Sequence, residues 1–284
     1  MKRLAIILAA SAPLFAQSAS FPEKPQNHAA LVDVRQIVLR SIAATERSWT
    51  GRDHYLYTER DEDRRLDEGA RVKSENVDIS KIIFVDEAPF EELVEHNGRP
   101  PTAEVQRRQA EKLDKLRHET RQDRVARLRE QQDNRSFIRE VPEGFDFELI
   151  GEEVVNGRPA WVLRATPRAG YRAHGKYGKI MSKAEGKLWV DKQDFGWVKV
   201  DGEVTQPFST GLLLARLLGG SHMTMEQTRF DGGIWMPKRI EVRASAKILF
   251  VISYDISRVL TYSDYQLLQR APLASVSNQQ RQAE

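Results

Sequence analysis

The residues of this sequence that could do acid–base chemistry are a few histidines and neighbouring carboxylates. His54 follows Asp53, and Asp191 precedes Asp194 by three positions, so either pair could supply a proton donor and acceptor. A strand residue and a turn residue explain the same positions more simply, and we favour that interpretation. The sequence has no GxSxG nucleophile elbow, HExxH, Walker loop or GxGxxG motif. We predict that the protein is not an enzyme and needs no cofactor; an envelope hydrolase is the less favoured alternative.

Metal binding is not expected either. The sequence has no cysteine, and its histidines occur singly, at His28, His54, His96, His118, His174 and His222. Structural zinc sites use cysteines or closely spaced histidines. We therefore predict neither a metal site nor a disulfide.

Four tryptophans, Trp161, Trp189, Trp197 and Trp235, fall within predicted strands. They could line a pocket for a sugar or a lipid, or they could belong to an ordinary β core, where aromatic side chains also contribute most of the buried area. Both interpretations stay open at this point.

The elements that would position these residues centre on a hairpin from Glu185 to Val204. Its second half alternates, with Val198, Val200 and Val204 on one side and charged residues on the other, as in a half-buried antiparallel strand. Asn156-Gly157 between two alternating runs predicts another hairpin. A helix is expected from Ala29 to Trp49, ended by Gly51.

Strands are expected at 53–61, 71–79, 81–85 and 90–97 in the first half, and at 223–230, 234–243 and 248–256 in the last third. In the final strand, Ile248, Phe250, Ile252, Tyr254 and Ile256 share one face. A sheet of this size usually curls. The prediction is an α+β fold, with one curled antiparallel sheet and the first helix on its concave face; the rival is two separate domains.

Thr102 to Arg135 differs from the rest, because strong helix formers and alternating charges fill it almost completely. A single helix of this length would reach roughly 50 Å at 1.5 Å per residue. Its apolar stripe is too sparse for a buried helix. We expect a solvated insertion, and a partner-docking arm is the alternative.

The leucine-rich run Phe208 to Ser221 is expected to form a short helix or loop bracketed by glycines. Leu213 and Leu217, four residues apart, would then share one side of a helix. They are either permanent core or a hinged cover over an apolar groove. We favour the cover, since five leucines in seven residues exceed what one face can bury.

The N-terminus carries Lys2 and Arg3 before the apolar run Leu4 to Ala16, the pattern of a secretory signal peptide. Cleavage is expected after Ala19 or Ala16; a membrane anchor, the alternative, needs about 20 apolar residues. Losing Lys2 and Arg3 lowers the formal charge from +3 to 3 − 2 = +1. We predict a soluble periplasmic protein with no transmembrane segment after cleavage and no nucleic-acid partner.

The order of these elements, with the motifs GKLWVD and WMPKR, resembles the LolA/LolB-like lipoprotein-carrier superfamily and a related sensor domain of the envelope stress response. The resemblance implies an unclosed β-barrel whose concave apolar face holds acyl chains. The predicted domains are a signal peptide at 1–19, a LolA-like domain at 20–270 with the insertion at 102–135, and a disordered tail at 271–284.

The function expected is a carrier or sensor for a lipid, a lipidated protein or another apolar ligand. The alternative is an envelope protein-interaction module that uses the charged helix. The candidate ligand-binding residues are Val198, Val200, Ile240, Val242, Phe250, Ile252, Tyr254, Leu213 and Leu217.

Overall fold

The computed structural model describes residues 33–67, 69–85, 88–172, 178–179, 181–210, 215–248 and 252–268. They belong to one compact unit that begins at Asp33. The predicted signal peptide at 1–19, the tail at 271–284, Leu213 and Phe250 lie outside the described residues. In the described part of the chain, no helix has both the length and the apolar character needed to cross a membrane.

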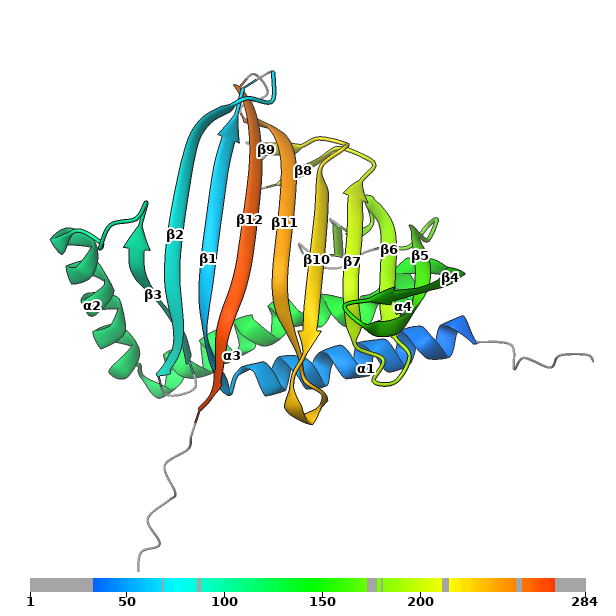
Figure 1. The fold of residues 1–284 in the computed structure, drawn as a ribbon, viewed down its shortest axis with the longest axis horizontal. Helices are drawn as coiled ribbons and strands as arrows, with labels where there is room; N and C mark the ends of the chain where they lie inside the picture. The colour runs from blue at the N-terminus through cyan, green and yellow to red at the C-terminus, as the bar shows by residue number, and fades with distance from the viewer. Residues whose placement is uncertain are drawn as a thin grey trace, which may run out of the picture. The chain divides into compact units, whose positions relative to one another are not determined.

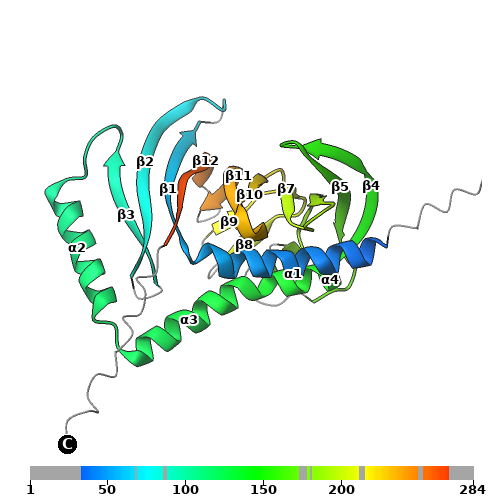
Figure 2. The same ribbon diagram turned by 60° about the horizontal axis from the view of Figure 1, so that its bottom comes forward.

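One antiparallel sheet of twelve strands organises this unit (Figure 1). Its main path runs β3-β2-β1-β12-β11-β10-β7-β6-β5-β4, and the short β9 pairs with both β8 and β11. Figure 2 shows the sheet curving over α1. The predicted α+β class with a large, open, curled sheet is confirmed. The strands are β1 (Tyr55–Leu66), β2 (Val72–Val85), β3 (Ala88–His96), β4 (Phe145–Val155), β5 (Arg158–Pro167), β6 (Ala184–Asp191), β7 (Trp197–Val204), β8 (Phe208–Thr210), β9 (Ala215–Leu217), β10 (His222–Arg229), β11 (Trp235–Ile248) and β12 (Ile252–Leu267).

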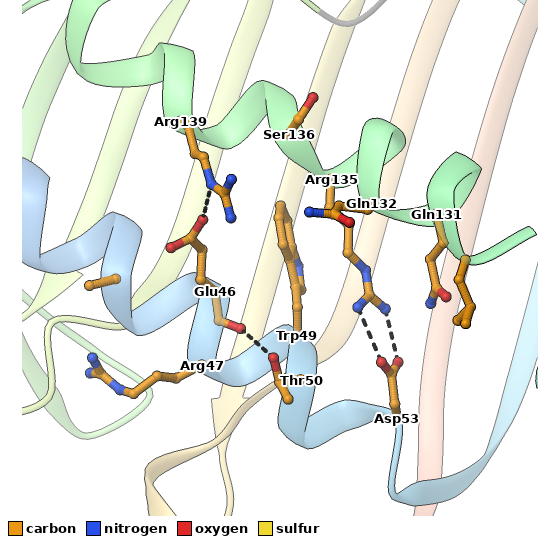
Figure 3. Close-up of a pocket in the computed structure, with 12 residues that line it drawn as sticks. Glu46, Arg47, Trp49, Thr50, Asp53, Gln131, Gln132, Arg135, Ser136 and Arg139 are labelled. Carbon is orange, nitrogen blue, oxygen red and sulfur yellow. Dashed lines mark hydrogen bonds and ion pairs between the residues drawn. The ribbon is translucent and has the colours of Figure 1, made fainter. Parts of the chain in front are cut away.

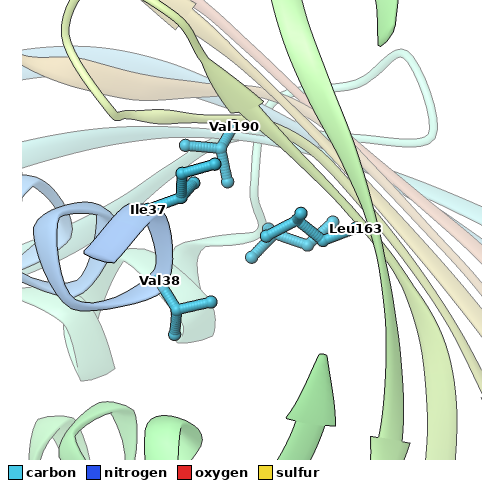
Figure 4. Close-up of a cluster of buried hydrophobic side chains, with 5 residues drawn as sticks. Ile37, Val38, Leu163 and Val190 are labelled. Atoms are coloured by element: carbon cyan, nitrogen blue, oxygen red, sulfur yellow. The ribbon is translucent and has the colours of Figure 1, made fainter. Parts of the chain in front are cut away.

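Helix α1 (Val34–Arg52) lies on the concave face, as predicted. The Asp33 side chain accepts a hydrogen bond from the Gln36 amide at 3.2 Å, which caps the first turn. Its apolar stripe packs against the sheet, in a cluster formed by Ile37, Val38, Leu163, Leu188 and Val190 (Figure 4).

The prediction that Gly51 ends this helix was wrong, since α1 continues to Arg52. Gly51 instead allows a close approach between α1 and Ile234. A Cβ at this position would lie 2.5 Å from Cδ1 of Ile234. The missing side chain therefore lets the end of α1 rest on the segment that leads into β11.

The GKLWVD motif shapes the β6–β7 hairpin. A Cβ at Gly186 would lie 2.1 Å from the Asp201 carbonyl oxygen, so the two strands meet more closely here than any side chain would allow. Asp191, at the end of the motif, is fully buried. Its carboxylate accepts hydrogen bonds from the amides of Gln193 and Asp194, at 2.9 and 2.7 Å, and so closes the turn.

A β-bulge in this hairpin corrects the predicted face of Val198. The pairing of β6 with β7 shifts by one residue, because Leu188 pairs with Val200 while Val190 pairs with Trp197. A one-residue shift moves the following side chains to the other face. Trp197 and Val200 thus face α1, while Val198 packs in a separate cluster with Trp189 and Trp235.

The charged insertion contains two helices, so the prediction of one long helix was wrong. These are α2 (Ala103–Arg117) and α3 (Arg121–Ser136), and neither buries a residue. The break occurs because Thr120 caps α3, its hydroxyl accepting a hydrogen bond from the Asp123 amide at 3.2 Å. Two short helical turns, η1 (Phe137–Glu140) and α4 (Val141–Gly144), lead from α3 into β4.

Helix α2 contacts the edge strand β3 through one side chain. Gln109 accepts a hydrogen bond from the Leu93 amide at 2.5 Å and donates one to the Leu93 carbonyl at 3.2 Å. Exposed strand edges attract other strands, and proteins often cover them. This contact gives part of the insertion a structural role at the edge of the sheet.

Four predicted segments differ from the elements found. The strands expected at 71–79 and 81–85 form the single strand β2. The strand expected at 248–256 is not one strand, because Ile248 ends β11 and pairs with Ile252, the first residue of β12. The described ends of the leucine-rich run form the paired strands β8 and β9 where a short helix or loop was expected.

Candidate functional site

An apolar cavity of about 520 Å³ lies between the concave face of the sheet and the helices. Its size falls within the range of roughly 300–1,000 Å³ that is usual for small-molecule sites. Helix α1 contributes Thr45, Trp49 and Arg52, which are spaced by four and three residues and so lie on one helical face. We refer to this space as the apolar cavity.

A row across the sheet that includes Ala165, Gly186 and Gly202 leaves room for the cavity, because these three residues are small. Five residues stand side by side on successive strands, from β5 to β11, in the order Ala165, Gly186, Gly202, Met223 and Val242. All five line the cavity. The neighbouring row, two residues away along each strand, has mostly larger side chains, namely Leu163, Leu188, Val200, Met225 and Ile240. The change from large to small residues opens the space under the helices.

The turns after α3 cover the cavity from the other side. Phe137, Ile138 and Val141 line it, and Ile138 and Val141 are buried in a cluster with Ile42 of α1. The Trp49 and Phe137 rings lie 6.1 Å apart. The cavity is therefore a half-open space bounded by the sheet, α1 and the segment that connects the charged helices to β4.

Arg52 is the cavity residue with the most unusual electrostatic surroundings. Its Nε donates to the Trp235 carbonyl at 2.7 Å, and its Nη2 donates to Oε1 of Gln227 at 2.9 Å. Both acceptors are neutral, and no ion pair of Arg52 is found among the described residues. Burial lowers the pKa of the guanidinium to about 10. Arg52 consequently keeps its charge at neutral pH, although it is largely removed from water.

Tyrosines of β1 and β12 lie beyond Arg52. The Tyr57 ring is 5.3 Å from that of Tyr265 and 6.0 Å from that of Tyr262. Burial raises the pKa of Tyr57 to about 12, and it also raises the pKa values of Tyr262 and Tyr265. These phenols are neutral at physiological pH, so they do not balance the charge of Arg52.

The predicted ligand-binding residues divide into several groups. Val200, Val242 and Leu217 line the cavity. Ile240 pairs with Met225, which lines the cavity, and Tyr254 pairs with Ala246 farther along the same strands. Neither Ile240 nor Tyr254 reaches the lining, and Val198 belongs to the Trp189 cluster. Leu213, Phe250 and the side chain of Ile252 are outside what the structure describes.

Several residues that shape the cavity were not predicted from the sequence. Phe137, Ile138 and Val141 directly follow the charged insertion, and their spacing could have indicated a short amphipathic turn. Arg52 carries no such signal, because an arginine in the last helical turn is ordinary. Its importance depends on contacts with β10 and β11 that are distant in sequence.

The carboxylates considered for acid–base chemistry have arginine partners. Asp53 accepts two hydrogen bonds from Arg135, at 2.8 and 3.1 Å, and His54 is exposed. Asp191 accepts hydrogen bonds from Nε and Nη2 of Arg158, at 2.6 and 2.8 Å. Burial raises the pKa of Asp191, but the hydrogen bonds from Arg158 and the turn amides outweigh it, and the net direction is down.

Asp194, the other member of the second pair, also contacts Arg158 and in addition Arg229. Both aspartates thus act as structural anions that fix the β6–β7 turn. Among the described residues, no group of three or more metal-binding side chains is placed to hold a metal ion.

A second hollow of about 610 Å³ lies between α1 and α3, on the opposite side of α1 from the sheet (Figure 3). Polar side chains such as Gln131 and Gln132 make up much of its lining. Ion pairs cross it from Arg135 to Asp53 and from Arg139 to Glu46. The hollow is a helix–helix groove held by surface charges, each pair worth about 0–1 kcal/mol.

No protein-family model matches the sequence, and no curated protein matches it. Among solved structures, the chain is similar to an outer-membrane lipoprotein-sorting domain from Vibrio parahaemolyticus, at 10% identity over 82% of this chain and 94% of that one, with a TM-score of 0.31. It is similar to a LolA superfamily protein from Nitrosomonas europaea, at 13% identity over 84% and 96%, with a TM-score of 0.29.

A chain of the Pseudomonas aeruginosa MucA/MucB complex also matches, at 12% identity over 83% of this chain and 99% of that one, with a TM-score of 0.23. Two of these structures, a lipoprotein-sorting domain and a LolA superfamily protein, carry descriptions of the kind that the sequence resemblance named. Because these likenesses are distant, what the protein binds has to be argued from its own cavity.

Proposed function

We propose that this protein is an exported carrier or sensor that binds one acyl chain of a lipid or lipidated molecule in the apolar cavity. The observation that carries the proposal is the cavity itself, a half-open apolar space bounded by the sheet, α1 and the Phe137–Val141 turns. Each buried CH₂ of a ligand gains about 0.8 kcal/mol. A half-open apolar space of 520 Å³ can therefore bury much of an acyl chain and supply binding free energy for it.

The sequence supports the cellular setting of this proposal. The first nineteen residues have the pattern of a signal peptide, so the site of action would be the periplasm. An acyl chain that crosses this aqueous space needs a protein to cover it. A carrier or a sensor of such chains fits both the cavity and the expected export.

The second candidate function is a protein-interaction module that uses the insertion helices. The groove between α1 and α3 favours it, because this groove is accessible and polar and adjoins two exposed apolar side chains, Val125 and Leu128. The two functions are compatible, since Trp49 lines both the groove and the apolar cavity.

Native mass spectrometry of the protein purified from its own envelope tests the first function. We expect a co-purifying mass that matches an acyl-bearing molecule and disappears on denaturation. The matched variants are Ala244→Phe, at a cavity-lining position, and Ala246→Phe, two residues along the same strand and outside the lining. Loss of the adduct only in Ala244→Phe would support the proposal. Absence of any lipid from the unmodified protein would contradict it.

A further inference from the structure

Arg52 brings a positive charge to the apolar cavity. Several other lining residues are charged, but they occupy the strand positions that alternate with the cavity-facing row. For example, Asp201 neighbours Gly202, and Arg243 neighbours Val242. Alternate side chains of a strand point to opposite faces. Among the described lining residues, Arg52 is thus the charged side chain that α1 brings to the cavity side.

The hydrogen bonds of Arg52 leave part of its guanidinium free. A guanidinium has five N–H donors, and the Trp235 carbonyl and Gln227 use one each, on Nε and Nη2. Both hydrogens of Nη1 and one of Nη2 have no acceptor among the described residues. The edge between Nη1 and Nη2 carries one hydrogen from each nitrogen, and such a pair binds a carboxylate through two parallel hydrogen bonds.

We propose that the cavity takes a long-chain fatty acid, with the alkyl chain along the small-residue row and the carboxylate on the free edge of Arg52. This inference rests on the proposed function and specifies its ligand. A fatty acid supplies both missing elements, an apolar chain for the cavity and one negative charge for a cation that is otherwise unpaired. A phospholipid or a lipoprotein brings two or more chains.

The cavity volume fits a single chain. A water-sized group takes up about 30 Å³, and a methylene is of similar size. Dividing 520 by 30 gives about 17 such groups. An apolar space of this size accommodates the chain of one ordinary fatty acid.

A purely structural role is the competing explanation for Arg52. A cation in the last turn of a helix interacts favourably with the helix dipole, and the bonds to Trp235 and Gln227 tie α1 to β11 and β10. This role needs no ligand. If the role is structural, removing the charge of Arg52 should change the stability of the protein alone. If Arg52 binds a carboxylate, removing the charge should change ligand affinity by an amount that depends on the ligand's head group.

The test compares dodecanoate, dodecanol and the dodecyltrimethylammonium cation, which share one chain length and differ in head group. Each ligand displaces the neutral fluorescent probe N-phenylnaphthylamine from the full mature chain. Arg52→Gln removes the charge, and Arg52→Lys keeps it. Arg47→Gln is the matched control, because Arg47 is exposed on the same helix and does not line the cavity.

We expect the unmodified protein and Arg47→Gln to bind dodecanoate more tightly than dodecanol, and the cation most weakly. In Arg52→Gln, the preference for dodecanoate over dodecanol should fall by at least about tenfold, while Arg52→Lys should keep part of it. If Arg52→Gln does not fold, the order of affinities of the three ligands for the unmodified protein still decides between carboxylate binding and a purely structural role.

Two results would overturn the inference in different ways. Equal binding of the three head groups, or an equal loss for dodecanoate and dodecanol in Arg52→Gln, would show that Arg52 is only a structural tie; the proposed apolar site would survive. Failure of every ligand to displace the probe from the unmodified protein would overturn the inference and the proposed function together.

Discussion

Replacing Ala244 by phenylalanine should fill the apolar cavity and prevent acyl binding. Ala244 lines the cavity two residues beyond Val242 on β11. The substitution adds six ring carbons to this space. At about 0.8 kcal/mol per displaced methylene, six of them remove up to about 5 kcal/mol of binding free energy. That limit corresponds to more than a thousandfold in Kd, and we expect at least tenfold because the chain can shift within the remaining space.

Displacement of a neutral fluorescent probe by dodecanoate measures this effect, with a thermal melt of each variant beside it. Ala246→Phe is the control, because Ala246 is on the same strand as Ala244, pairs with Tyr254 of β12 and does not line the cavity. A ring placed in an open cavity should leave Tm unchanged or raise it. Overpacking a filled core costs about 1–3 kcal/mol, so a lower Tm with unchanged binding in Ala244→Phe would refute the reasoning.

Three further predictions concern other parts of the chain. Leu217→Ala should weaken dodecanoate binding more than it lowers Tm if the leucine-rich segment covers the cavity; a loss of about 2–5 kcal/mol in stability with intact binding would show that Leu217 is core. Asp191→Asn should lower stability by about 3 kcal/mol at neutral pH, because it leaves Arg158 without its buried carboxylate. Folding lowers the pKa of Asp191. Urea melts should therefore show the full stability difference between the unmodified protein and Asp191→Asn above about pH 3.9, the pKa of an aspartate in the unfolded chain, and this difference should vanish as the pH falls through the folded pKa. A stability difference that stays constant at all pH values would contradict the role of the charge. Limited proteolysis within Thr102 to Arg135 should leave the two fragments associated on size exclusion, because β1 pairs with β12 across the cut; separation into two folded fragments would instead support two domains.

Local signals predicted the hairpins well. Asn156-Gly157 joins β4 to β5, and the alternation around Glu185 to Val204 marks β6 and β7. These features succeed because turn chemistry and side-chain alternation act over a few residues. The amphipathic spacing of α1 predicted its packing on the sheet for the same reason.

Features that depend on pairing could not be predicted in this way. The bulge that separates Val198 from Val200 is a property of how β7 meets β6, not of β7 alone. The pairing of Ile248 with Ile252 joins the two ends of an apolar stretch of sequence that has no glycine or asparagine to signal it. The break before α3 did carry a signal, because Thr120 followed by Asp123 is a helix-capping pattern.

The candidate site was the least predictable part of the molecule. Its floor combines single residues from five strands, among them Ala165, Gly186 and Gly202, and these become neighbours only when the sheet forms. Val200, Val242 and Leu217 could be chosen from their apolar character. Arg52 could not, because its contacts with Trp235 and Gln227 join residues about 180 positions apart.

The most direct test of an acyl-binding cavity is the dependence of affinity on chain length. Titration of the delipidated protein with saturated fatty acids of increasing length should show about a fourfold gain in affinity per added CH₂, the equivalent of about 0.8 kcal/mol. The gain should level off once the chain fills the 520 Å³ cavity, at about 17 carbons. Affinity that is independent of chain length, or that continues to rise without a plateau, would contradict an acyl site of this size.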